Sequence, residues 1–238
     1  MPQIKEFFDN FSKDYDKLAF EQSLGIQYLS KIETNFVLEN CPIKKGDKIL
    51  DMGIGTGRFA SLLAKKGASI EGIDISEKMI KRAKKKLKEK SANFTLADAG
   101  EHIPFGDNSF NYIICIRVLK YIVPWKKTVK EASRVLKRNG IFILEIPNLY
   151  SVQFFGLRKA NYFLFNFNNV KNTLKQFKFE IIKLKSGSRF PFPIYKEINN
   201  ISMLNAIKKF EWILDKLLPN PLFSRNIMIV CKKKGEYV

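Results

Sequence analysis

The chain has 238 residues, of which 45% are hydrophobic and 21 are Phe, which suits one large domain with a packed core and excludes a disordered chain. The formal net charge is +19, and 34 of the 42 basic residues are Lys. Such a surface could attract nucleic acid, anionic lipid or an acidic partner, or it could reflect residue usage that is biased towards Lys.

Two helical segments are predicted before the first strand. Residues 3–22 form a short amphipathic lead, because aromatic and apolar residues recur at helical spacing: Phe7, Phe8, Phe11, Tyr15 and Leu18. Residues 23–40 form a longer helix, and Pro42 and Gly46 then break the chain. We therefore expect a helical lead over residues 1–41.

The next hundred residues alternate between short apolar strands and helices. Strands are predicted at 48–52, 69–75, 93–97, 112–118 and 141–146. Helices are predicted at 58–66, 77–90 and 125–137, with Asn139 and Gly140 ending the last of them. This alternation predicts parallel βαβ units and an α/β, doubly wound sheet. The strands are apolar runs, as expected when helices cover both faces of the sheet.

After residue 150 the pattern changes. Residues 151–168 are rich in aromatic residues and follow no clear period, whereas 170–177 look helical and 179–184 and 227–231 look like strands. An insert at about 186–222 contains an amphipathic stretch from 201 to 218. It would lie at the sheet edge or over the ligand crevice. We therefore expect a single domain over 1–238, divided into the lead, a cofactor-binding core at 42–150 and a C-terminal part at 151–238 with a cap insert.

A glycine loop follows the first core strand and precedes a helix. Gly53, Gly55 and Gly57 form a GxGxG pattern, and Arg58 stands where a dinucleotide fingerprint has its last glycine. Asp51 lies two residues before the first glycine. Its carboxylate would repel a pyrophosphate and attract a cationic group. The loop therefore favours S-adenosylmethionine, which carries an ammonium and a sulfonium, over a dinucleotide.

Two further acidic residues end the next two strands. Asp74 ends the second, where a carboxylate can accept hydrogen bonds from two ribose hydroxyls. Asp98 ends the third, where its carboxylate could accept from an adenine amine while Ala99 offers a backbone N–H. Three acids at the ends of three successive strands form a more specific pattern than any one of them.

The segments ILDMGIGTGRFA, EGIDIS, ADAGEHIPFGDNSFNYIICIRVLKYI and RVLKRNGIFILEIPN resemble, in order and spacing, the successive motifs of class I S-adenosylmethionine-dependent methyltransferases. The resemblance spans about 47–150. It implies a Rossmann-like sheet of seven strands with an antiparallel last strand, and S-adenosyl-L-methionine as cofactor. It also implies contacts of Asp51 and the glycine loop with the methionine part, Asp74 with the ribose and Asp98 with the adenine.

The resemblance adds further cofactor-binding positions. Met79 corresponds to an apolar residue beside the adenine, and Ile116 to a backbone carbonyl near the cofactor's amino group. Ile75 belongs to the EGIDIS motif, and Tyr15 lies in a lead that is similar to a segment folding over the cofactor. Two positions depart from the family pattern. This chain has Asn111 where many relatives have Asp, and Lys120, on the substrate side, where many have His.

Several other residues have more than one interpretation. His102, the sole histidine, is a general base or a solvated loop residue. Lys120 and Tyr121 orient an acceptor, or Tyr121 packs under the next helix. The basic helix 77–90 binds RNA phosphates or forms a solvated face. The aromatic residues at 162–167 line an acceptor pocket, stack on bases or pack in the core.

The sequence as a whole predicts an S-adenosylmethionine-dependent methyltransferase acting on a small-molecule or lipid-like acceptor. The alternatives are an RNA methyltransferase that uses the basic surface and a non-catalytic cofactor-binding subunit. No catalytic residue and no oligomeric state are indicated. Cys41, Cys115 and Cys231 form no CxxC pair, and no signal peptide or 18-residue apolar run is present. We therefore expect no metal, no transmembrane segment and a cytoplasmic protein.

Overall fold

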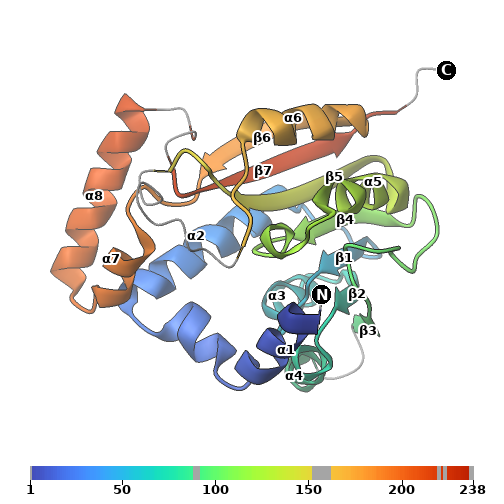
Figure 1. Cartoon of the computed structure of the whole chain (residues 1–238), viewed down its shortest axis with the longest axis horizontal. Helices are drawn as coiled ribbons and strands as arrows, with labels where there is room; N and C mark the ends of the chain where they lie inside the picture. The colour runs from blue at the N-terminus through green and yellow to red at the C-terminus, as the bar shows by residue number, and fades with distance from the viewer. Residues whose placement is uncertain (1, 88–91, 152–161, 219–220, 222–223, 236–238) are drawn as a thin grey trace.

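The computed structural model describes residues 2–87, 92–151, 162–218, 221 and 224–235. A seven-stranded sheet with the order β3-β2-β1-β4-β5-β7-β6 runs through its centre (Figure 1). Strands β1 to β5 pair in parallel, and β7 runs antiparallel to both of its neighbours. The predicted α/β sheet with an antiparallel last strand is confirmed. The strands are β1 Lys48–Met52, β2 Ser69–Asp74, β3 Ala92–Leu96, β4 Phe110–Cys115, β5 Leu136–Pro147, β6 Phe179–Ser186 and β7 Asn226–Lys233.

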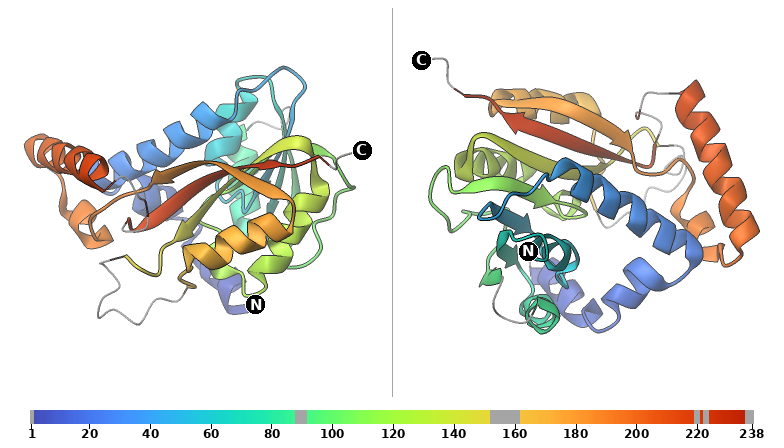
Figure 2. Two further views of the ribbon diagram at one scale, coloured as in Figure 1. Left: turned by 90° about the horizontal axis from the view of Figure 1, so that it is seen from above. Right: turned by 180° about the vertical axis from the view of Figure 1, so that it is seen from behind.

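Helices cover both faces of the sheet, as the view from above in Figure 2 shows. One face packs against α2 (Leu24–Asn40), α3 (Arg58–Ala64) and α4 (Glu77–Leu87), and the other against α5 (Trp125–Val135) and α6 (Phe167–Gln176). The central strands are therefore buried on both sides, which explains their unbroken apolar runs. The outer strand β6 is mostly exposed, and its Ile182 is 52% accessible. The covered-sheet prediction thus holds for the centre but not for this edge.

The segment Asn139–Gly140 does not end a helix. Helix α5 already ends at Val135, and β5 begins at the next residue. The register moves from Phe110 paired with Leu136 to Tyr112 paired with Ile141, and Asn139 has a φ of 61°. Asn139 and Gly140 therefore form an irregularity inside β5. Such an irregularity suits turn-forming residues as well as a helix end does. The helix end predicted at residue 137 is therefore wrong, because α5 ends at Val135.

The N-terminal lead is anchored beside the glycine loop by two aspartates. It consists of α1 (Pro2–Phe11) and a π-helical turn, η1 (Lys17–Glu21), rather than one helix. Ser76 donates its hydroxyl hydrogen bond to Asp9 at 2.6 Å, and Thr56 donates to Asp16 at 2.5 Å. Lys86 of α4 also pairs with Asp16 at 2.8 Å. These contacts hold the lead against the carboxyl ends of β1 and β2.

The insert between β6 and β7 folds into α7 (Phe192–Glu197) and α8 (Ile201–Leu217), which lie at one end of the molecule beside α2 (Figures 1 and 2). Ser23 at the start of α2 donates to the backbone oxygen of Tyr195 at 2.7 Å. Glu211 of α8 accepts from the phenols of Tyr28 and Tyr195. This buried polar network fixes the insert to α2, and Phe192 and Lys196 of α7 face a surface groove.

Candidate functional site

A cavity of about 660 Å³, part of it open to solvent, lies at the carboxyl ends of the parallel strands. This is the edge at which doubly wound sheets bind their ligands. The lead contributes Ile4 and Phe8 to its wall, so the cavity lies between the sheet edge and α1. Nine of the eleven residues predicted from the sequence line it: Tyr15, Gly53, Gly55, Asp74, Ile75, Met79, Asp98, Ala99 and Ile116.

The glycine loop takes a conformation that side chains would obstruct. Gly53 has a φ of 69°, and a Cβ there would lie 2.3 Å from a methyl group of Val118. The backbone therefore approaches the cavity at a point where only glycine fits. Gly57 lies outside the cavity lining. A Cβ on Gly57 would lie 2.6 Å from Leu87, so this third glycine permits close packing of α3 on α4.

Asp74 joins the loop to the start of α4. Its Oδ2 accepts from the Gly55 N–H at 2.8 Å, and its Oδ1 accepts from the Ser76 N–H at 2.9 Å. Each carboxylate oxygen has a second lone-pair direction, which leaves capacity for two hydroxyl donors. Burial raises the pKa of Asp74, while the N–H groups of Ser76 and Gly55 oppose that rise.

Asp51 lies at the end of β1 but is not part of the cavity lining. It is buried, and its Oδ2 has no hydrogen-bond partner among the described residues. Burial raises the pKa of this carboxyl to about 7, while the guanidinium of Arg58 opposes the rise. A buried oxygen without a partner costs free energy, so the position favours a nearby donor or cation.

Asp98 follows β3 and lines the cavity. One of its oxygens, Oδ1, accepts from the Gly100 N–H at 2.7 Å, which fixes the turn after the strand. Asp98 is only partly buried. Asp98 therefore closes a turn and also faces the cavity, where the sequence predicted a ligand contact.

The sequence reasoning missed Arg117 in the wall of the cavity, and it assigned Phe8 no ligand contact. Arg117 follows β4 with a φ of 62°, and its guanidinium pairs with the buried Glu33 at 2.8 Å. The same guanidinium lies over the ring of Phe20 in the lead. The ring of Phe8 meets Tyr121 edge-on at 5.2 Å. The positive φ of Arg117 cannot be inferred from residue type, whereas the aromatic spacing of α1 was a usable signal for Phe8.

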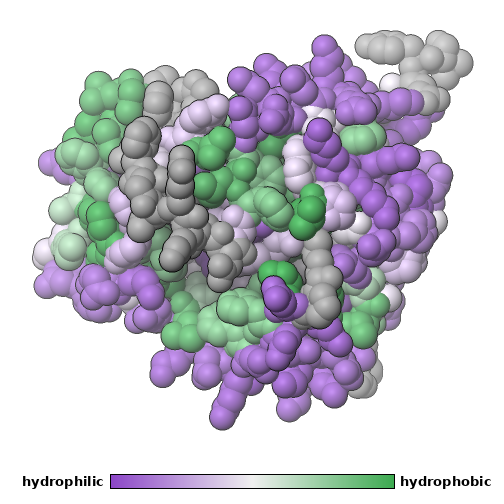
Figure 3. Space-filling view, in the orientation of Figure 1, coloured by the Kyte–Doolittle hydropathy of each residue, from purple (hydrophilic) through white to green (hydrophobic). Residues whose placement is uncertain are grey.

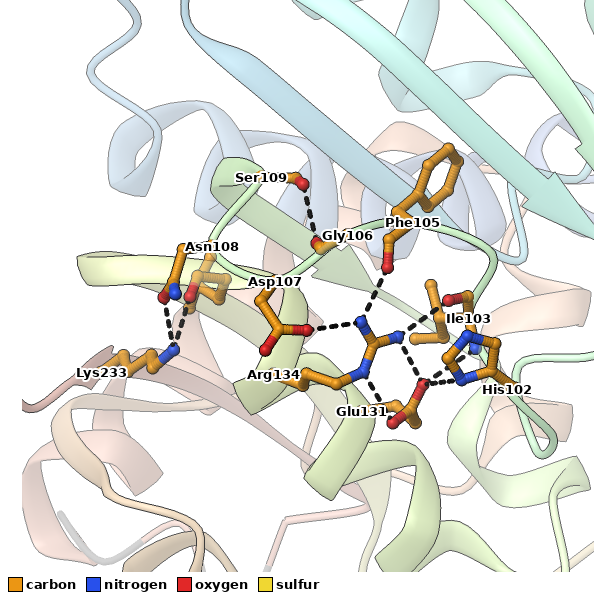
Figure 4. Close-up of polar contacts among 11 residues, drawn as sticks. His102, Ile103, Phe105, Gly106, Asp107, Asn108, Ser109, Glu131, Arg134 and Lys233 are labelled. Carbon is orange, nitrogen blue, oxygen red and sulfur yellow. Dashed lines mark hydrogen bonds and ion pairs between the residues drawn. The ribbon is translucent and has the colours of Figure 1, made fainter.

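His102 lies outside the cavity, in a polar network on the α5 face (Figure 4). Its Nδ1 lies 2.9 Å from Glu131, and its side chain is 72% exposed. Arg134 donates to Glu131 at 2.7 Å, and this hydrogen bond holds the pKa of Glu131 at about 2; Arg134 also donates to Asp107 at 2.9 Å. The position fits the solvated-loop interpretation and leaves His102 with no access to a ligand in the cavity.

Comparisons with known proteins agree with this geometry. A model of the methyltransferase domain matches residues 50–144. Over 210 residues the chain is 32% identical to an uncharacterized protein of Methanocaldococcus jannaschii, covering 87% of this chain and 74% of the other. Over 171 residues it is 32% identical to the demethylmenaquinone methyltransferase of Staphylococcus aureus, covering 68% of each. The chain belongs to the class I S-adenosylmethionine-dependent methyltransferases.

A solved structure supports the fold of this methyltransferase. The magnesium protoporphyrin IX methyltransferase of Synechocystis PCC 6803, determined with bound S-adenosylhomocysteine, superposes with a TM-score of 0.69 at 14% identity. The match covers 98% of this chain and 99% of that one. The cofactor of the family is S-adenosylmethionine. Of the helices in the described parts of the chain, none combines the length and the apolar character that a membrane crossing requires.

Proposed function

We propose that this chain transfers the methyl group of S-adenosylmethionine to a small-molecule or lipid-like acceptor. The observation that carries the proposal is that the cofactor cavity continues into a second groove. The two share Phe8, Tyr15, Arg117 and Tyr121, and the groove measures about 920 Å³ including open solvent. A small-molecule acceptor also agrees with the name of the Staphylococcus aureus relative, a demethylmenaquinone methyltransferase.

The groove has mostly aromatic and apolar walls. Phe7, Phe11 and Leu18 of the lead line one part of it, and Phe192 of the insert lines another. In Figure 3, apolar residues gather over the centre of the face and over the end with α8, while hydrophilic residues cover most of the rest. The single domain proposed for 1–238 thus uses its lead, residues 1–41, and its cap insert, about 186–222, to form the acceptor side of the core at 42–150.

We assign the cofactor contacts residue by residue. Asp74 binds the ribose hydroxyls. Asp98 and Ala99 bind the adenine, whose faces pack against Ile75 and Met79. The methionine part lies on Gly53 and Gly55 near the carbonyl of Ile116, with the carboxylate of Asp51 attracting its ammonium. Gly57 shapes the loop, and Tyr15 covers the site from the lead.

The chemistry of these groups fits the cofactor. The buried oxygen of Asp51, which has no hydrogen-bond partner among the residues that the structure describes, suits a positive group and would repel a pyrophosphate. Bound S-adenosylmethionine supplies a methyl group that is already activated. The chain therefore needs mainly to orient the acceptor and to exclude water from it. Aromatic side chains on both sides of the groove provide both functions.

Methyl transfer from radiolabelled S-adenosylmethionine tests the proposal. The chain would be incubated with a lipid extract, total RNA and water-soluble metabolites from a microbial lysate, each in a separate reaction. We expect label in the lipid or small-molecule fraction. Label confined to RNA would favour the alternative that uses the basic surface. Failure to bind S-adenosylhomocysteine at millimolar concentration, measured by isothermal titration calorimetry, would contradict the proposal altogether.

The pKa of Asp51 predicts a pH dependence of cofactor binding. Asp51 attracts an ammonium only when it is ionised, which requires a pH above its pKa of about 7. The affinity for S-adenosylhomocysteine should therefore be at least about tenfold lower at pH 5.5 than at pH 8. Asp51→Asn should bind weakly at both pH values, and any dependence that remains would report Asp74. Equal affinity of the wild-type chain at the two pH values would refute the Asp51 assignment.

A further inference from the structure

A group of charged side chains lies in and beside the groove that we propose as the acceptor site. Arg117 and Lys120 line the groove itself. Glu145, near the end of β5, is 6% exposed, and Arg225, just before β7, is partly buried. We call these four residues the acceptor-side charge cluster. Three of them are cations and one is a carboxyl, and nothing in an activated methyl donor requires them.

The positive charge of this cluster is only partly balanced. Arg117 pairs with Glu33 at 2.8 Å. Within the part of the chain that the structure describes, the side chain of Lys120 makes no hydrogen bond or ion pair. Its ammonium lies over the rings of Tyr121 and Tyr162, at 5.1 and 4.9 Å from their centroids. Aromatic faces stabilise a cation, but they do not neutralise it.

Glu145 compensates this charge poorly. Asn226 donates to its Oε1, but its Oε2 has no partner among the described residues. Burial raises the pKa of Glu145, which disfavours the anion, and burial lowers the pKa of Lys120 to about 8, which disfavours the cation. The third cation, Arg225, donates to the hydroxyl of Ser188 at 2.9 Å and lies over the ring of Phe192. The cluster therefore has capacity for an added anion.

We propose that the acceptor is an apolar molecule carrying an acidic oxygen group, a carboxylate or a phosphate, which Lys120 binds with electrostatic support from Arg117 and Arg225. This inference rests on the proposed function, because it takes the groove as the acceptor site. A cation paired with an anionic oxygen forms a strong hydrogen bond when water is scarce. The aromatic walls bind the apolar body, and the ammonium then fixes its orientation relative to the cofactor cavity.

Three probes of the same ring system test this acceptor chemistry: 2-naphthoate, 2-naphthyl phosphate and the neutral 2-naphthamide. Each would be titrated by calorimetry at pH 7 into the full chain saturated with S-adenosylhomocysteine. We expect at least one anionic probe to bind about tenfold or more tightly than the amide. Lys120→Met should reduce that preference to about twofold or less. Lys171→Met removes the same charge from an exposed site on α6 and should leave the preference unchanged.

A pH series adds a result that a merely structural role of Lys120 would not give. The charged groups that face Lys120 are Glu145, Arg117, Arg225 and Glu33, and the guanidinium groups stay protonated throughout. Affinity for 2-naphthoate should fall about fivefold or more between pH 7 and 9.5, because Lys120 loses its proton around pH 8. Lys120→Met should show no such fall. Lys120→Arg should keep the preference for the acid without the pH dependence.

The outcomes separate the two proposals. Equal affinity for acid and amide, or an undiminished preference in Lys120→Met, would overturn the anionic acceptor. A chain that binds S-adenosylhomocysteine but neither anionic probe at a few millimolar would also overturn it. A chain that fails to bind S-adenosylhomocysteine in the preceding titration would overturn the proposed function instead. Preference for the phosphate over the carboxylate, or the reverse, identifies the acidic group.

Discussion

Replacing Asp74 by Asn should raise the Kd for S-adenosylhomocysteine about a hundredfold. Both carboxylate oxygens already accept a backbone N–H, from Gly55 and from Ser76. An amide keeps only one oxygen and turns its NH₂ group towards one of these donors. The loop therefore loses a contact, and a ribose hydroxyl loses a charged acceptor. Hydrogen bonds to charged groups contribute about 1.5–3 kcal/mol, which corresponds to roughly tenfold to hundredfold in affinity.

A matched control separates this effect from a general loss of folding. Asp47 accepts a backbone N–H from Lys44 at 2.8 Å in the turn before β1, so Asp47→Asn makes the same chemical change outside the cavity. It should bind S-adenosylhomocysteine as the wild type does. Calorimetry gives the affinities, and thermal unfolding without ligand shows whether each variant is folded. A folded Asp74→Asn variant that binds within threefold of the wild type would refute the ribose assignment.

The central strands were predictable because burial on both faces leaves an unbroken apolar run. Strand β1 has its predicted bounds, Lys48–Met52, and β2 differs from its prediction by one residue. The glycine loop and the acidic strand ends then followed from the alternation of strands and helices. Strand β6 was predictable in position but not in exposure, because the sequence does not show that it lies at the edge of the sheet.

The errors have local physical causes. Asn139 and Gly140 suit any backbone that needs a positive φ, so residue type alone cannot separate a helix end from a strand irregularity. Helix α1 ends at Phe11, and the lead on both sides of this end is held by tertiary contacts of Asp9 with Ser76 and of Asp16 with Thr56. These partners lie far from the lead in the sequence. The expectations at 152–161 and 88–90 lie outside the described residues.

Site residues that follow directly from the end of a strand were predictable. Residues whose orientation depends on contacts with distant parts of the chain were not. Spacing placed Asp74 and Asp98 at the cavity, and both line it. Spacing treated Gly53 and Gly57 alike, yet only Gly53 lines the cavity, because Gly57 packs against α4. Arg117 was missed because its pairing with Glu33 joins residues 84 positions apart. Such a long-range pair leaves no periodic pattern.

That pair leads to the prediction with the largest effect on stability. Glu33 of α2 is 2% exposed, and its two carboxylate oxygens pair with Arg58 and Arg117 at 2.8 Å each. Burial alone would raise the pKa of Glu33, but the two guanidinium groups outweigh burial and hold the pKa below its ordinary value. The carboxylate thus pairs with two largely buried cations, one at the start of α3 and one just after β4, and balances one of their two positive charges.

Glu33→Gln should lower the free energy of unfolding by about 3–5 kcal/mol, because it removes the carboxylate that pairs with both guanidinium groups. Urea denaturation measures this loss. Glu39→Gln, on the same helix, removes the charge of a side chain that is 56% exposed and lies 4.0 Å from Lys183, and it should cost less than about 1 kcal/mol. A loss below about 1 kcal/mol in Glu33→Gln would show that the ion pairs contribute little beyond the cost of burying them.

The pH dependence of this loss follows from the lowered pKa. The folded chain keeps Glu33 ionised at pH values where the unfolded chain, with an ordinary pKa of 4.5, has taken up a proton. The stabilisation is therefore complete above that value and is lost as the pH falls through the lower, folded pKa. The difference between wild type and Glu33→Gln should accordingly shrink as the pH falls below 4.5. Because Arg117 lines both the cofactor cavity and the groove, the variant should also bind S-adenosylhomocysteine more weakly at neutral pH.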